Sequence, residues 1–157
     1  MISPVDKSFW ETQHNANNPT WLTGTTLNLL LTKHGLTTDF LKDKKILEIG
    51  VGLGHCTREF QQYAKELYGS DISQAALDRV ADFVTAGFLS TNLSQAPAVD
   101  LAFSHLVFVH CTDQEVERII NDVNLTDDGV FTFQVSGLKD NITFRQISKS
   151  CIRLTFF

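Results

Sequence analysis

Short apolar segments alternate with amphipathic ones along most of this chain. Apolar, strand-like segments occur at residues 45–49, 67–70, 87–89, 99–104 and 130–135. Between them, apolar residues recur at helical spacing over residues 57–64, 73–85 and 112–123. Strands that alternate with helices form parallel sheets whose two faces are covered by the helices. The pattern therefore predicts an α/β fold, a doubly wound and mainly parallel sheet with helices on both faces.

The two ends of the chain fit this alternation less well. Residues 1–18 are polar and aromatic without a clear period, and we interpret them as an N-terminal arm in front of a single domain, residues 19–157. Pro19 favours the start of a helix over about residues 20–33, because proline at the first helical position loses no hydrogen bond. Trp21 would lie on the buried side of this helix.

At the other end, Asp128-Gly129 predicts a turn before the last clear strand. The residues beyond that strand favour a helix over 142–147 and a strand over 152–157. The C-terminal segment thus adds at most one further strand to the predicted sheet.

Composition narrows the classes of function. The chain has 157 residues, with 13 Lys+Arg against 18 Asp+Glu and a formal net charge of −5. A module that binds nucleic acid needs a basic face, so we expect no nucleic-acid partner. Cys56, Cys111 and Cys151 are widely spaced and odd in number, which is typical of reduced thiols and not of a disulfide framework or a zinc site. Because neither a signal peptide nor a membrane-length apolar run is visible, we expect a cytoplasmic protein that binds no membrane and no metal.

The most informative motif is a glycine-rich turn. Directly after the first predicted strand, the chain reads Glu48-Ile49-Gly50-Val51-Gly52-Leu53-Gly54. Glycine adopts positive φ and has no Cβ to keep a ligand from the backbone. Such a turn presents free amides and a helix N-terminus at the carboxyl end of the strand, where doubly wound folds bind ligands. A tight turn without a ligand is the alternative interpretation.

Asp71 is the second informative residue. It ends the second predicted strand, 23 positions after Glu48. In doubly wound folds, an acid at this place accepts hydrogen bonds from both hydroxyls of a ribose. Capping of the next helix is the alternative role, but Ser73 already offers that cap and would leave Asp71 free for a ligand.

The turn matches neither a dinucleotide fingerprint nor a P-loop. Counted from Gly50 or Gly52, the place of the last fingerprint glycine is taken by His55 or Thr57, and no G-K-[ST] follows. Glu48 would repel a pyrophosphate, whereas it suits a cationic ligand that carries an ammonium group and a sulfonium.

In their order and spacing, the segments ILEIGVGLG, YGSDIS, VDLAFSH and DDGVFTFQ resemble those of the class I S-adenosylmethionine-dependent methyltransferases. The resemblance covers roughly residues 21–135. It implies a Rossmann-like sheet of strand order 3-2-1-4-5-7-6, with the last strand antiparallel, and S-adenosyl-L-methionine as the cofactor. The cofactor-binding residues that it implies are Glu48, Gly50, Val51, Gly52 and Gly54 around the methionine part, Asp71 at the ribose, Ile72 beside the adenine, and Ser104 with His105 facing the transferred methyl.

Two features depart from the usual pattern of this family. An acid often follows the third strand and meets the adenine amino group, whereas this chain has Asn92 there, whose amide oxygen can accept the same hydrogen bond. A helix and a β-hairpin usually follow the fifth strand, and without them that strand would be an open edge. Three outcomes follow: residues 152–157 form a replacement strand, two chains pair across the edge as a homodimer, or the chain is a shortened and inactive relative.

Histidine is the natural proton acceptor near neutral pH, if the methyl acceptor is a hydroxyl or an ammonium group. His105 and His110 follow the fourth predicted strand and are the candidate catalytic residues. His14 lies in the N-terminal arm and reaches the site if the arm closes over it. We interpret His34, near a helix end, as structural and His55 as a residue that lines the pocket.

These observations favour methyl transfer from S-adenosylmethionine to a small-molecule acceptor. The short C-terminal segment favours, as an alternative, a catalytically silent cofactor-binding or dimerisation domain. An NAD-dependent oxidoreductase is the third interpretation, and the missing fingerprint glycine disfavours it.

Overall fold

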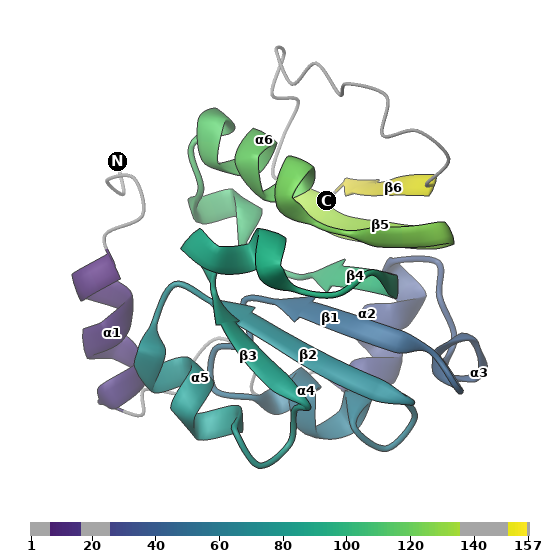
Figure 1. Ribbon diagram of the computed structural model, residues 1–157, viewed down its shortest axis with the longest axis horizontal. Helices are drawn as coiled ribbons and strands as arrows, with labels where there is room; N and C mark the ends of the chain where they lie inside the picture. Colours follow the sequence, from purple (N-terminus) through teal and green to yellow (C-terminus); the bar gives the residue numbers. More distant parts are fainter. Residues whose placement is uncertain (1–6, 17–25, 136–150, 157) are drawn as a thin grey trace.

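A six-stranded sheet forms the centre of the protein (Figure 1). The computed structural model describes residues 7–16 and 26–134 in full and the backbone of residues 135 and 151–156. The strand order is β3-β2-β1-β4-β5-β6, and all neighbouring pairs are parallel. The strands are β1 (Lys45–Ile49), β2 (Glu66–Asp71), β3 (Ala86–Leu89), β4 (Val99–Ser104), β5 (Leu125–Val135) and β6 (Cys151–Phe156).

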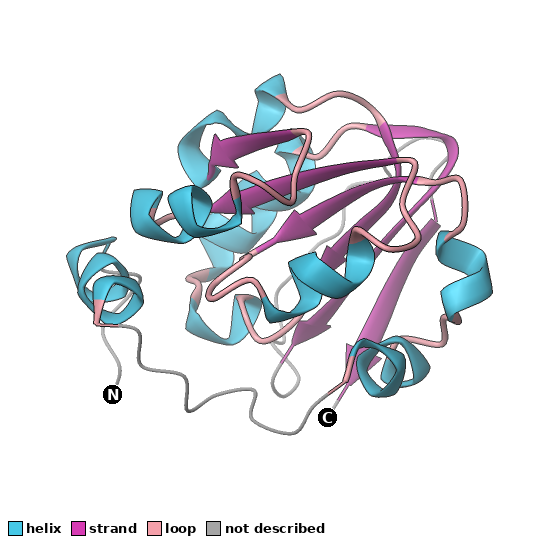
Figure 2. Cartoon of the chain, turned by 90° about the horizontal axis from the view of Figure 1, so that it is seen from below, coloured by secondary structure: helices cyan, strands magenta, loops and turns pink. Residues whose placement is uncertain are grey.

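Helices cover both faces of this sheet (Figure 2). The α-helices are α1 (Lys7–Asn15), α2 (Leu27–Lys33), α3 (Thr38–Leu41), α4 (His55–Phe60), α5 (Gln74–Val80) and α6 (Asp113–Asp122), and two short 3₁₀ helices are η1 (Ser90–Gln95) and η2 (Phe108–His110). Successive residues of β1 alternate between two apolar cores: Ile46 packs with residues of α2 and α4, and Leu47 packs with residues of α6. The predicted doubly wound α/β fold is therefore confirmed.

The first helix after the N-terminal segment begins later than the sequence predicts. Thr26 is extended, and its side chain accepts a hydrogen bond from the Leu29 N–H, so α2 begins at Leu27 and not near residue 20. The Glu59 carboxylate of α4 accepts the Leu27 N–H at 3.1 Å, which satisfies a donor of the first turn and ties α2 to α4. Trp21, which we expect on the buried side of this helix, lies outside the described residues.

The N-terminal arm contains a helix that the hydrophobic pattern did not indicate. Residues 7–15 form α1, which packs against α5 and lies beside it in Figure 1. Only His14 of this helix is buried. Because one buried residue leaves no apolar stripe, the pattern of hydrophobic positions could not reveal α1.

The predicted turn at Asp128-Gly129 is wrong, because β5 continues through these residues as an irregular strand. Val99 of β4 pairs with Leu125, and Leu101 pairs with Val130. Between these two pairs β5 advances by five residues while β4 advances by two. A Cβ on Gly129 would lie 2.9 Å from the Val99 carbonyl oxygen. The glycine therefore permits a bulge, and not a chain reversal.

The last described strand corrects two expectations about the C-terminal segment. β6 pairs with β5 along Cys151–Phe156, as the predicted replacement strand, but it is parallel where the family pattern implied an antiparallel strand. It also occupies the edge of β5 through which we expected two chains to pair, so a dimer would need another surface. The predicted helix over 142–147 lies outside the described residues.

Within the described ranges, no helix is long and apolar enough to cross a membrane. Nor do these ranges contain a group of three or more His, Cys, Asp or Glu side chains that could hold a metal ion.

Candidate functional site

The glycine-rich turn lies between β1 and α4, at the carboxyl end of the central strands. Gly50, Gly52 and Gly54 all have positive φ, of +80°, +53° and +78°. The Gly50 N–H donates to the Ser70 carbonyl oxygen at 2.7 Å, which fastens the turn to the end of β2. The chain therefore needs glycine here for its backbone conformation as well as for access.

The three glycines differ in the space around them. A Cβ on Gly50 would lie 2.1 Å from Cγ2 of Val107, and one on Gly54 would lie 2.7 Å from Cγ1 of Val80. A Cβ on Gly52 would meet no atom within 4 Å. Gly50 and Gly54 thus serve packing, whereas Gly52 leaves open space at the backbone that a ligand can occupy.

Arg58 of α4 stabilises the turn from the side. Its Nη1 donates to the carbonyl oxygens of Leu53 at 2.9 Å and Gly54 at 3.0 Å. Its guanidinium group lies over the ring of Phe83, 4.9 Å from the ring centroid. Arg58 is absent from the predicted site residues, although an arginine four positions after the last glycine is a usable signal for a contact across one helical turn.

Asp71 closes the opposite side of the turn. Its Oδ2 accepts the Gly52 N–H at 3.0 Å and its Oδ1 accepts the Ser73 N–H at 3.0 Å. Burial raises the pKa of this carboxyl, and these two backbone donors lower it. Ser73 does cap α5, as predicted, and Asp71 accepts these two backbone bonds beside that cap, so its role toward a ligand stays a prediction. A carboxylate has about four lone-pair positions, so the backbone donors leave capacity for a ligand.

Glu48 is a second buried carboxyl next to the turn. Its Oε2 accepts the Thr57 hydroxyl at 2.6 Å, and its side chain is 5% exposed. Burial raises the pKa of Glu48 to about 8, and the nearby charge of Asp71 adds to this rise. Glu48 therefore holds its proton at neutral pH, and a cation placed beside it would favour the ionised form.

Helix α1 lies against the N-terminal end of α5, and it brings His14 close to Asp71. His14 is 4% exposed, its positive form would lower the pKa of Asp71, and its Nδ1 has no hydrogen-bond partner within the described residues. The Glu11 carboxylate accepts the Ala75 N–H at 3.1 Å, and Arg79 donates to the His14 carbonyl oxygen at 2.9 Å. Helix α1 is therefore fastened to α5 with His14 near Asp71, and contact of His14 with a ligand stays a prediction.

The carboxyl end of β4 carries the predicted catalytic candidates. Ser104 is 1% exposed, and its hydroxyl has no partner within the described residues. His105 follows it, and its Nδ1 lies 3.3 Å from Nε2 of His34. His110 lies in η2, where its half-buried ring contacts Trp10 of α1, with the ring centroids 5.0 Å apart. The two candidates thus have different surroundings, a second histidine for one and a tryptophan for the other.

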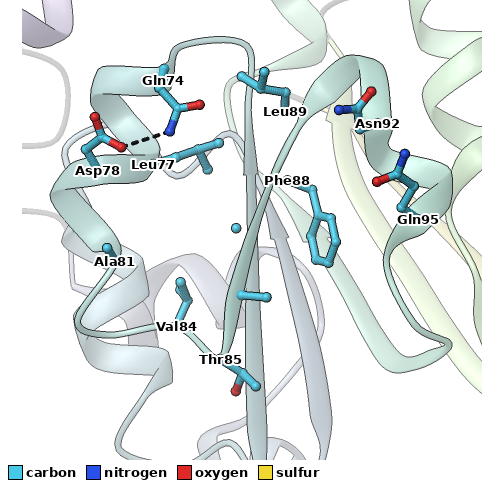
Figure 3. Close-up of a pocket in the computed structure, with 12 residues that line it drawn as sticks. Gln74, Leu77, Asp78, Ala81, Val84, Thr85, Phe88, Leu89, Asn92 and Gln95 are labelled. Atoms are coloured by element: carbon cyan, nitrogen blue, oxygen red, sulfur yellow. Dashed lines mark hydrogen bonds between the residues drawn. The ribbon is translucent and has the colours of Figure 1, made fainter.

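The residues expected beside the adenine do not gather as closely. Ile72 is half-buried directly after Asp71. Asn92 is exposed in η1 and lines a groove of about 470 Å³ between α5, β3 and η1, together with Gln74 and Phe88 (Figure 3). No residue of the glycine-rich turn lines this groove, so we do not assign it to the same site.

A comparison with protein families matches residues 46–125 to the family described as a methyltransferase domain. This match covers half of the chain and includes the glycine-rich turn and Asp71. The chain belongs to this family, and the predicted class I S-adenosylmethionine-dependent methyltransferase domain is confirmed. The interpretation as a nicotinamide-dependent oxidoreductase does not fit this family. Among curated proteins, no match to the chain was found.

Solved structures with a similar fold include methyltransferases in complex with S-adenosylhomocysteine. The DhpI–SAH complex has 16% sequence identity and a TM-score of 0.60, over 81% of this chain and 65% of that one. The N-methyltransferase NodS from Bradyrhizobium japonicum WM9, in complex with S-adenosyl-l-homocysteine, has 17% identity and a TM-score of 0.58, over 78% of this chain and 69% of that one.

A third similar structure is phosphoethanolamine N-methyltransferase 1 from Haemonchus contortus, in complex with phosphoethanolamine and S-adenosylhomocysteine. It has 19% identity and a TM-score of 0.53, over 78% of this chain and 30% of that one. The chain thus spans between 30% and 69% of the length of these three proteins. At these identities, the likeness shows the fold alone.

Proposed function

We propose that this chain binds S-adenosylmethionine at the glycine-rich turn and transfers its methyl group to a small-molecule acceptor. The observation that carries the proposal is the open backbone at Gly52 beside the buried carboxylate of Asp71. The family match supports the same reaction class.

The residues around the turn fit such a cofactor. The unused lone pairs of Asp71 suit the two ribose hydroxyls, and Glu48 suits the ammonium group of the methionine part. His14 Nδ1 and the Ser104 hydroxyl are buried polar atoms without partners in the described part of the chain. A buried polar atom without a hydrogen-bond partner destabilises the folded protein. Polar groups of a bound cofactor would remove this cost by bonding to these two atoms.

Other predicted contacts remain part of the proposal. Gly50, Val51 and Gly54 would shape the wall around the methionine part, with Val51 packed under α5. Ile72 would contact the adenine, and Asn92 would reach its amino group only after a change of side-chain position.

The cofactor supplies a methyl carbon that its sulfonium already activates, so the protein mainly has to align the acceptor with that carbon. A hydroxyl or an ammonium acceptor also has to lose a proton. His105 and His110, at the end of β4, are the candidates to receive it. The cytoplasmic location expected from the sequence stays a prediction.

Titration calorimetry with S-adenosylhomocysteine and with NAD tests the binding step. We expect S-adenosylhomocysteine to bind and NAD not to bind. Asp71→Asn should weaken the binding at least about tenfold, because one charged hydrogen-bond acceptor is lost. The control is Asp78→Asn, an exposed aspartate of α5 that bonds to Gln74.

Equal affinity of wild type and Asp71→Asn would remove Asp71 from the site. Binding of S-adenosylhomocysteine without methylation of any compound in a broad acceptor screen would favour the silent cofactor-binding domain instead.

A further inference from the structure

Three polar side chains from distant parts of the sequence meet at the carboxyl end of β4 and β5. Nδ1 of His34, the C-terminal cap of α2, lies 2.8 Å from the Thr132 hydroxyl of β5. Nε2 of the same ring lies 3.3 Å from Nδ1 of His105. We call Thr132, His34 and His105 the histidine relay. Both nitrogens of His34 are thus within hydrogen-bond distance of another member.

The histidine relay lies in a mainly apolar environment. His34 is 3% exposed, Thr132 is fully buried, and the His34 ring packs on Phe103 with the centroids 4.7 Å apart. Lys33 of α2 acts electrostatically on both rings, and the neutral Thr132 of β5 lies against His34. Burial lowers the pKa of both rings to about 4; the charges of His105 and then Lys33 add to the shift of His34, and the charge of Lys33 adds to that of His105. Both rings are therefore neutral at pH 7.

A neutral imidazole has one N–H donor and one nitrogen acceptor, so the relay has two directions. In one direction, His105 Nδ1–H donates to His34 Nε2, and His34 Nδ1–H donates to the Thr132 oxygen. This arrangement leaves Nε2 of His105 with a free lone pair. In the reverse direction, Nε2 of His105 carries the proton and cannot act as a base.

His105 lies at the same edge of the sheet as the glycine-rich turn. Ser104, which precedes it, pairs in register with Ile49 of β1, which precedes Gly50. Two residues further on, Val107 packs directly on Gly50, and the left-handed Leu106 between them turns the chain back over the turn. A base at His105 would therefore lie at the same edge of the sheet as the cofactor that the proposed function places at the glycine-rich turn.

Resting on the proposed function, we infer that Nε2 of His105 receives the proton of a hydroxyl acceptor, and that His34 and Thr132 are positioning residues that fix the His105 tautomer. The acceptor oxygen forms a bond to the methyl carbon while the carbon–sulfur bond breaks and its electron pair stays on sulfur. The hydroxyl proton moves to Nε2 of His105 and then leaves to water.

The choice of a hydroxyl over an amine follows from base strength. An ammonium ion has to lose its proton before its nitrogen has a lone pair for the attack, and a ring of such low basicity is a poor acceptor for that proton. A hydroxyl becomes strongly acidic as its oxygen gains the methyl group, so even a weak base takes its proton at that moment.

The first experiment needs neither cofactor nor acceptor. The ¹⁵N shifts of the histidine rings report which nitrogen carries the proton, and His105→Gln and His34→Gln assign the signals. We expect His105 to be neutral at pH 7, with its proton on Nδ1. Thr132→Val should shift the His105 signals, and Thr132→Ser should restore them. Thr126→Val, on the same strand but bonded to Asp100, is the matched control and should change nothing.

A proton on Nε2 of His105, or His105 signals that ignore Thr132→Val, would overturn the relay. If S-adenosylhomocysteine fails to bind at all, the proposed function fails, whatever the tautomer. The two failures are therefore distinguishable.

The second experiment compares a panel of alcohols and phenols with a panel of amines, and measures S-adenosylhomocysteine formation. We expect turnover with hydroxyl compounds and a loss of about a hundredfold in kcat for His105→Gln. Thr132→Val should lower kcat by about tenfold and leave the affinity for S-adenosylhomocysteine within about twofold. Turnover confined to amines, at a rate independent of His105, would contradict the assignment.

Discussion

The two halves of the sheet's carboxyl edge are built from different chemistry. At the ends of β1 and β2, backbone amides of the glycine-rich turn meet two buried carboxyls, Asp71 and Glu48. At the ends of β4 and β5, the neutral imidazoles of His34 and His105 meet the Thr132 hydroxyl. The first half is suited to hold a charged ligand, and the second is suited to receive a proton. Under the proposed function, binding and proton transfer would therefore depend on separate sets of residues.

The largest effect should come from the packing of the turn. Gly50→Ala places a Cβ 2.1 Å from Cγ2 of Val107 and puts alanine at a φ of +80°. We expect a loss of about 3 kcal/mol in the free energy of unfolding, measured by urea denaturation. The double variant Gly50→Ala/Val107→Ala should recover part of this loss, because it removes the clashing methyl groups. No recovery would mean that backbone strain accounts for the whole cost.

Gly52→Ala should separate binding from stability. The added Cβ meets no atom within 4 Å, so only the strain of the positive φ remains, about 1–2 kcal/mol. The same Cβ would stand in the space proposed for the cofactor. We therefore expect a larger loss of S-adenosylhomocysteine affinity, in calorimetry, than in any variant of the histidine relay. Full affinity would place the ligand elsewhere.

The two halves should also respond oppositely to pH. The pKa of Glu48 is raised to about 8, so its contribution to stability is present at low pH and is lost as pH rises toward 8. The pKa values of His34 and His105 are lowered to about 4, so their contribution is present above pH 6.5 and is lost as pH falls toward 4.

Of the contributions that Glu48, His34 and His105 make to stability, only that of Glu48 changes between pH 6.5 and 8. We expect the free energy of unfolding to fall over this range in the wild type and to stay level in Glu48→Gln, which keeps an acceptor for the Thr57 hydroxyl. Glu117→Gln, at an exposed position of α6, is the control and should retain the fall. A wild-type protein with constant stability over this range would show that Glu48 is ionised.

The smallest effect concerns α1. Glu11→Gln weakens the hydrogen bond to the Ala75 N–H at the start of α5. We expect faster amide hydrogen exchange in residues 7–15, with little change in the overall unfolding transition. Exchange as slow as in the wild type would show that other contacts, such as Arg79 with the His14 carbonyl oxygen, hold α1 in place.

The sequence predicted the half of the site that is local in the chain. Gly52 and Asp71 are 19 positions apart, and each lies in a motif whose strand and helix can be recognised from periodicity. His34 and Thr132 are 98 positions apart, and neither lies in a sequence motif that indicates a functional role. His34 was therefore interpreted as structural, although His105 was named as a candidate.

The wrong predictions about the fold also concern features that depend on contacts between distant parts of the chain. Asp128-Gly129 has the composition of a turn, but the neighbouring strand β4 holds these residues in an extended bulge. The pairing direction of β6 depends on its partner β5, and α1 depends on polar contacts with α5. Local propensity does not contain these tertiary contacts.

The most direct test of the account is to follow the backbone amide shifts of the ¹⁵N-labelled protein while S-adenosylhomocysteine is added. We predict that the largest shifts occur at residues 50–54, at Asp71 and Ile72, and at residues 104–107. Shifts confined to the groove beside β3, or no shifts at a saturating concentration of the compound, would contradict the placement of the cofactor at the glycine-rich turn.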